Sequence, residues 1–174
     1  MKDMFGGLPK WAQGVIAVAV VGGVGFLGYK AYKKIQESKS LKDSDQTAKD
    51  ANDEYKKLLR SGGSGATLTH PEIVYQTASN SIVNLLNGCE LPSSEQEVVK
   101  TIKETVKKPI DWYFLVKKFG SQMIDDCGWG TGESPYALPE LLKDQLGQGD
   151  YLGFPTGGNY EDTKKYLKSI GITI

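Results

Sequence analysis

The chain has 174 residues, with 21 basic and 21 acidic side chains, so its net charge at neutral pH is zero. A single arginine and fourteen acidic against ten basic residues after residue 60 exclude a typical nucleic-acid-binding domain. One histidine excludes a His-rich metal site or a Ser-His-Asp triad within one chain, and we expect no cofactor. Cys89 and Cys127 fit no metal spacing. A reduced pair would suit a cytoplasmic domain, and a disulfide the opposite side.

After a short tail at residues 1–10, the segment 11–29 reads WAQGVIAVAVVGGVGFLGY and carries no charge. A helix of about 20 apolar residues spans a hydrocarbon core of roughly 30 Å. Trp11 and Tyr29 stand where interfacial aromatic residues are enriched. These features predict a transmembrane helix. A cleaved signal peptide and a buried core helix are the alternatives, but the first has a shorter apolar core and the second rarely holds so many glycines.

The predicted membrane helix carries small residues that would let another helix approach closely. Ala19 and Gly23 form a small-x-x-x-small pair, which Gly22 and Gly25 extend. We expect a packing face for a second copy or another membrane protein, although glycine is in any case frequent in membrane helices.

The charges beside this segment predict its orientation. Lys30, Lys33 and Lys34 crowd its C-terminal flank, so the positive-inside rule places the rest of the chain on the cytoplasmic side. The same lysines would contact anionic lipid headgroups.

Residues 30–60 form a lysine-rich stalk with a thin apolar stripe, interpreted either as an amphipathic helix or as a solvated tether. Residues 61–68 contain Ser-Gly-Gly-Ser-Gly and are expected to be a flexible linker. The head domain would then cover residues 69–174.

The head shows helical periodicity and no convincing strand pattern, so we predict an all-α bundle of five helices. The expected ranges are 72–87, 94–106, 110–119, 138–146 and 159–170, with glycine-rich loops at 125–134 and 147–158. Thr69 with Glu72 has the form of a capping box, and Asn159 is expected to cap the last helix. The inner face of the first helix is predicted to be Val74, Ala78, Ile82, Leu85 and Leu86.

Few residues suggest chemistry. His70, beside Pro71 at a helix start, is most simply a surface residue. Glu133 is the weak catalytic candidate, because it lies in a glycine-rich loop before Ser134 and resembles the Glu-Ser pair of lysozyme-like wall-cleaving enzymes. The alternative is a turn with Trp129 packed on the bundle, or with Trp129 available for a protein partner.

Two resemblances add expectations. The segment from Glu72 to Tyr151 resembles an annexin-type four-helix repeat. Its order is a helix ending in Leu-Leu-Asn-Gly, a Ser-Ser-Glu loop, a second helix, a short break, an aromatic helix ending in Phe-Gly and a Leu-x-x-Leu-Leu helix ending near Gly-Asp-Tyr. The Gly-x-Gly-Thr calcium loop of that family is absent, since Gly88-Cys89-Glu90-Leu91-Pro92 replaces it. The resemblance therefore implies a helical arrangement without the calcium site.

The overall layout is similar to minor membrane proteins of tailless icosahedral bacteriophages with an internal lipid membrane. This implies a structural protein whose partners are the bilayer and other membrane or shell proteins, a second copy included. The alternatives are a membrane-tethered peptidoglycan hydrolase that uses Glu133 and a lysis protein that permeabilises the membrane.

Overall fold

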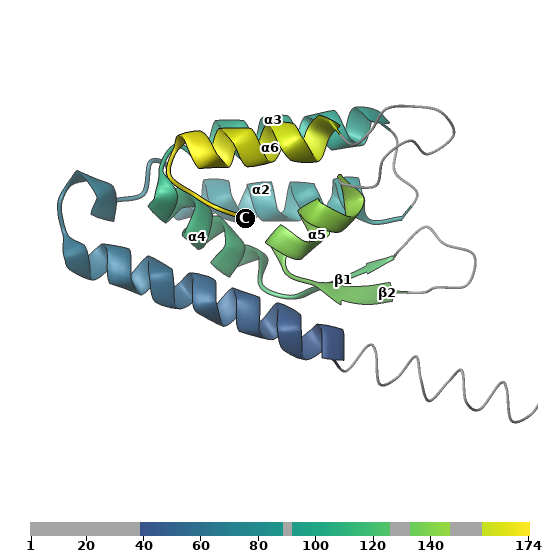
Figure 1. Cartoon of the computed structure of the whole chain (residues 1–174), viewed down its shortest axis with the longest axis horizontal. Coiled ribbons are helices and arrows are strands. Elements are labelled where there is room, and N and C mark those ends of the chain that lie inside the picture. Colours follow the sequence, from purple (N-terminus) through teal and green to yellow (C-terminus); the bar gives the residue numbers. More distant parts are fainter. Residues whose placement is uncertain (1–38, 89–91, 126–132, 147–157) are drawn as a thin grey trace, which may run out of the picture. The chain divides into compact units, whose positions relative to one another are not determined.

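The computed structural model of the chain describes residues 39–88, 92–125, 133–146 and 158–174 (Figure 1). Residues Ser40–Ile174 form one compact unit. The predicted membrane helix at 11–29 lies outside the described residues. Among the helices that the structure describes, none combines the length and the apolar character needed to cross a bilayer.

The described part is mainly helical, which confirms the predicted fold class for the head. A helix over residues 39–61, called the entry helix below, leads through the 3-10 turn η1 (Ser64–Ala66) into the bundle. Five helices follow, each within two residues of its predicted start: α2 (Glu72–Leu86), α3 (Pro92–Thr105), α4 (Pro109–Phe119), α5 (Leu138–Gln145) and α6 (Gly158–Ser169).

A two-stranded antiparallel hairpin stands where the sequence suggested a glycine-rich loop. Strand β1 (Gln122–Asp125) pairs with β2 (Glu133–Tyr136), and Met123 lies opposite Pro135. The prediction of an entirely strand-free head was wrong here. Four residues are too few to establish an alternating pattern, and a proline within a run argues against a strand. Glu133, the catalytic candidate, is therefore the first residue of strand β2.

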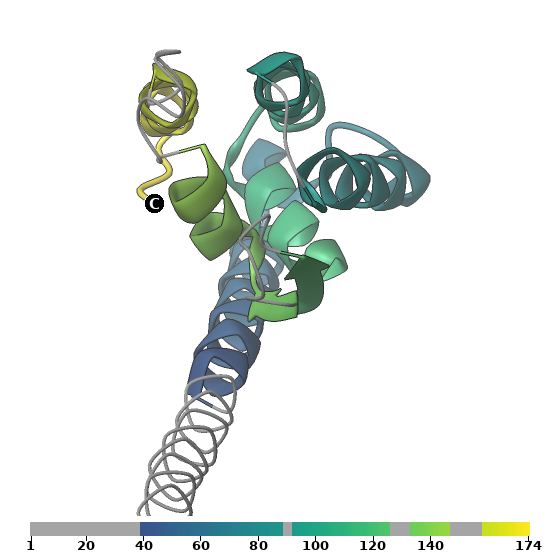
Figure 2. The same ribbon diagram turned by 90° about the vertical axis from the view of Figure 1, so that its right-hand side faces the viewer.

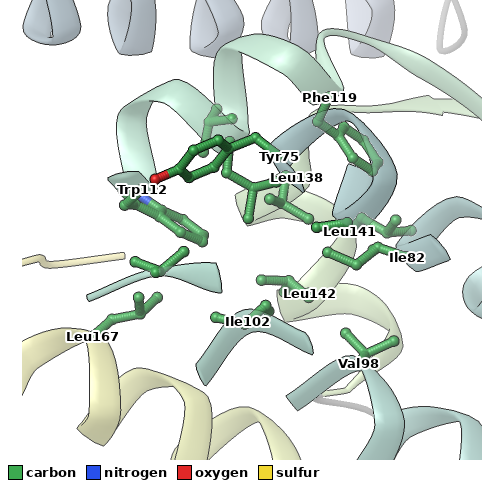
Figure 3. Close-up of a cluster of buried hydrophobic side chains, with 14 of the residues drawn as sticks. Tyr75, Ile82, Val98, Ile102, Trp112, Phe119, Leu138, Leu141, Leu142 and Leu167 are labelled. Atoms are coloured by element: carbon green, nitrogen blue, oxygen red, sulfur yellow. The ribbon is translucent and has the colours of Figure 1, made fainter. Parts of the chain in front are cut away.

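The core lies where α2, α3, α4, α5 and α6 meet (Figure 3). On α3, α4 and α5, the residues Ile102, Phe114 and Leu141 are fully or almost fully buried. On α2 the prediction was partly wrong, because Val74 and Leu85 are only half-buried while Tyr75 is fully buried. The Tyr75 hydroxyl donates to Asp111 Oδ1 at 2.6 Å, which allows a polar tip to enter the core.

Helix α6 lies beside α3 and runs parallel to it (Figures 1 and 2). Asn159 Nδ2 donates to Glu95 Oε2 at 2.7 Å near the start of both helices, and the Tyr166 hydroxyl donates to Val106 O near their ends. Helix α6 begins at Gly158, so Asn159 is its second residue, and the prediction that Asn159 caps this helix was wrong. Its side-chain amide instead donates to Glu95 of α3, a buried carboxylate that requires a hydrogen-bond donor.

The backbone at Gly171 imposes a requirement that we expect to see in stability. Gly171 follows α6 with φ of 86°, a left-handed conformation that other residues adopt at a cost. Gly171→Ala is therefore expected to lower the free energy of unfolding by about 1 kcal/mol, measured by urea denaturation. Gly158→Ala is the matched control. Gly158 opens α6 without a positive φ and has open space at its Cβ position, so alanine is expected to be neutral or slightly stabilising. Equal effects of the two changes would contradict the requirement.

Candidate functional site

Most of the residues predicted to have a function lie outside the described part of the chain. These are the membrane-helix packing residues, the headgroup lysines and the partner-contact candidate, namely Ala19, Gly22, Gly23, Gly25, Lys30, Lys33, Lys34 and Trp129. Their roles stay predictions. Glu133 and His70 are the candidates that the structure does place.

Glu133 is exposed at the start of β2, directly opposite Asp125 of β1. A carboxylate that acts as a general acid at neutral pH usually sits in an apolar pocket that raises its pKa. The residue paired with Glu133 in the structure is a second exposed acidic side chain, Asp125, and not an apolar pocket. His70 is half-buried, and its Nε2 lies 3.2 Å from Glu104 O. His70 lies just before α2 and Glu133 begins β2, and no described contact joins the two side chains.

The contact that stands out joins the entry helix to β2 and α5. Ser40 Oγ and Ser44 Oγ each lie 3.0 Å from Pro135 O, so both hydroxyls reach the same carbonyl. Thr47 Oγ1 donates to Glu140 Oε1 at 2.7 Å, and Ser44 Oγ is also 2.9 Å from Glu140 Oε2. We call the contacts of Ser40, Ser44 and Thr47 with Pro135 and Glu140 the junction.

Glu140 serves two elements at once. It is the third residue of α5, and its Oε2 accepts the Ala137 backbone N–H at 3.1 Å, which caps the helix. Its remaining acceptor positions face the entry helix, where Ser44 is almost completely buried. A carboxylate accepts several hydrogen bonds at once, so one side chain starts α5 and fixes the entry helix.

Further along, the entry helix makes aromatic contacts with α4. Tyr55 lies 5.0 Å from Phe114 between ring centroids, and Phe114 lies 5.2 Å from Tyr75 in an edge-to-face arrangement. Lys117 Nζ stands 4.9 Å above the Tyr55 ring. Burial, and secondarily the charge of Glu72, raises the pKa of Tyr55, so its hydroxyl stays neutral at physiological pH. The entry helix is thereby held on the head along most of its length (Figure 1).

A second polar cluster surrounds Asp111 in the first turn of α4. Asp111 is fully buried, and its two oxygens accept the Thr69 N–H and hydroxyl, the Tyr75 hydroxyl, and the N–H groups of Lys107 and Lys108. Burial acts to raise the pKa of Asp111, but the hydrogen bonds, above all those from Thr69 and Tyr75, outweigh it and lower the pKa. The predicted capping of α2 by Thr69 was therefore wrong, because its hydroxyl is used by Asp111 and Pro71 precedes the helix.

The described residues also form one open groove between α2 and α3, of about 310 Å³. Its lining is small and mostly uncharged, with Glu104 as the single acidic side chain: Ile73, Val74, Thr77, Ala78, Ser81, Thr101, Glu104 and Thr105. Within the described ranges no three His, Cys, Asp or Glu side chains gather as metal ligands would. A lone carboxylate beside threonines does not assemble a nucleophile with a base.

The chain matches no protein-family model, no curated protein and no solved structure.

Sequence reasoning missed the junction, although a signal was present. Ser40, Ser44 and Thr47 recur at intervals of four and three, which places their hydroxyls on one face of a helix. The apolar stripe of the same segment is thin and does not by itself predict a docked helix. In the structure, the hydroxyl face docks on the Pro135 carbonyl and the Glu140 carboxylate.

Proposed function

We propose that this chain is a single-pass membrane-anchored structural protein, whose helical head stands on the cytoplasmic face and connects the membrane to a neighbouring protein layer. The layout suits a virion protein that links an internal membrane to the capsid around it. The residues of 11–29 supply the anchor, with Lys30, Lys33 and Lys34 at the headgroups and the Ala19/Gly23 face toward another membrane helix.

The junction is the observation that carries this proposal. A freely jointed tether would let a head drift far from its anchor, whereas the entry helix is held on the head from Ser40 onward. Only residues 30–39 then separate the head from the predicted anchor. Such a short connection favours a protein that keeps two layers at a fixed spacing over one that must search for a substrate.

Two buried acidic side chains, Asp111 and Glu95, and the half-buried Glu140 support the same interpretation. Asp111 joins the start of α4 to α2 and the segment before it, Glu140 joins α5 to the entry helix, and Glu95 joins α3 to α6. Each of these carboxylates accepts hydrogen bonds from another element. Their arrangement stabilises a rigid body.

Protease protection of the full-length protein in sealed vesicles tests the anchor and its orientation. We expect a protected fragment of about 20 residues around Trp11–Tyr29, and cleavage of the head in inverted vesicles alone. Mass spectrometry identifies the fragment. Val21→Arg is the control, because an arginine at the centre of the run costs about 2.5–3.5 kcal/mol of insertion free energy and should abolish protection.

Two outcomes would contradict the proposal. Absence of any protected fragment would remove the anchor. Cleavage of the head from the outside only would place it at the cell wall, where Glu133→Gln and wild type should then be compared on purified peptidoglycan.

A further inference from the structure

Two exposed hydrophobic side chains mark the end of the head where the chain enters it. Leu41 is 44% exposed on the entry helix and Met123 is 51% exposed on β1. We call these two residues the entry patch. Other large hydrophobic side chains that the described residues expose to this degree are Leu59, at the far end of the entry helix, and Ile73, at the start of α2.

A hydrogen bond of the junction connects the residues next to the two members of the entry patch. Ser40, the neighbour of Leu41, donates to Pro135 O at 3.0 Å, and Pro135 is the cross-strand partner of Met123. Paired residues of antiparallel strands have Cα atoms about 5 Å apart. Leu41 is next to Ser40 in the chain and Met123 is paired with Pro135, so both residues adjoin the Ser40–Pro135 hydrogen bond although 82 positions separate them.

The length of chain before Ser40 determines what lies near this end. Ten residues, 30–39, connect it to the predicted membrane segment. They reach about 15 Å as a helix and at most about 36 Å when fully extended. With the proposed anchor in the membrane, this length would keep the entry patch close to the bilayer surface, whereas about 30 Å of entry helix separates it from the far end of that helix.

The charges at this end indicate that apolar contact, and not attraction of charge, would hold the patch on lipid. Lys39 and Lys42 flank Leu41, while Asp43, Asp125 and Glu133 are exposed nearby. Mixed charges give little net attraction to anionic headgroups. Leucine and methionine gain free energy when their apolar surface leaves water.

We infer that the entry patch rests in the interfacial region of the bilayer and sets the tilt of the head on the membrane. This inference depends on the proposed anchor. A head that touches lipid through Leu41 and Met123 presents its opposite end, with η1 and the start of α2, away from the membrane toward a protein layer.

The test uses the full-length chain in phosphatidylcholine vesicles, with Cys89 and Cys127 replaced by serine and a single Met123→Cys labelled with an environment-sensitive fluorophore. We expect a blue-shifted emission on vesicle binding and quenching by nitroxide-labelled lipid. Added phosphatidylglycerol should change this little. Ile73→Cys is the matched control, since Ile73 is 69% exposed at the other end and its label should remain in water.

Leu41→Cys gives an independent second position, should the label on β1 disturb the hairpin. Flotation of the labelled protein with vesicles separates the two proposals. Protein that fails to float overturns the anchor, whereas protein that floats with unquenched labels at positions 41 and 123 overturns the entry patch alone. A blue shift that grows with protein concentration and is not quenched by lipid would assign the patch to a second copy, and would also overturn the inference.

Discussion

Asp111→Asn is expected to lower the free energy of unfolding by about 3–5 kcal/mol, a large share of the total stability of a small domain. The carboxylate accepts five hydrogen bonds from three parts of the head. An asparagine replaces one acceptor oxygen with an NH2 group, which leaves buried donors facing a donor. Urea denaturation followed by circular dichroism measures the loss.

Asp53→Asn is the matched control for this change. Asp53 is largely exposed and lies 3.6 Å from Lys56 on the entry helix, so its replacement should change stability by no more than about 0.5 kcal/mol. A loss below about 1 kcal/mol for Asp111→Asn would show that the cluster around Asp111 is not a major source of stability.

The same carboxylate gives the wild type a pH dependence with a defined sign. The pKa of Asp111 is lowered from an ordinary value of 3.8, so the folded state binds its proton less readily than the unfolded state. The stabilisation is complete above pH 3.8 and is lost as pH falls toward and through the folded-state pKa. The difference in stability between wild type and Asp111→Asn should therefore shrink in this acidic range.

Glu140→Ala is expected to release the entry helix while leaving the rest of the head folded. The change removes the Glu140 oxygens that accept from Thr47 and the Ala137 N–H and lie beside Ser44 Oγ, at a cost of about 2–3 kcal/mol, while Ser44 keeps the Pro135 carbonyl as an acceptor. Because the entry helix buries few apolar side chains besides Ala51, this loss is a large part of what holds it. Hydrogen exchange should become faster by a factor of ten or more in peptides from residues 40–61.

Glu133→Ala provides the comparison, since Glu133 is an exposed carboxylate on the adjoining strand. It should leave exchange in the entry helix unchanged. If both substitutions accelerated exchange equally, or neither did, Glu140 would not be the residue that fixes the helix.

Much of the head could be predicted because its helices carry strong local signals. The spacing of Val98, Ile102 and Val106 and the closely spaced leucines of α5 are sufficient to predict which faces are buried. What could not be predicted depends on partners distant in sequence. Tyr75 is buried because Asp111, 36 positions away, accepts a hydrogen bond from its hydroxyl, and no local pattern contains that information.

The partners of the junction could not be predicted for the same reason, although the hydroxyl face of the entry helix could. Ser44 and Glu140 are 96 positions apart, and neither residue alone suggests a buried contact. The hairpin was missed because its strands are short, and because Pro135 contributes to the fold through its carbonyl, which accepts hydrogen bonds from another element. Sequence patterns report on helices that bury apolar faces and are weak for helices that dock through hydroxyl groups.

The position of the junction along the entry helix also determines how the head resists mechanical load. A force applied at residue 39 along the helix axis acts on the contacts of Ser40, Ser44, Thr47 and Tyr55 at the same time, because all four lie along the pulled rod. Contacts loaded together in shear must fail together, whereas contacts peeled from one end fail one at a time. If the head connects two layers that move against each other, as we propose, this arrangement would distribute the tension over all contacts of the entry helix.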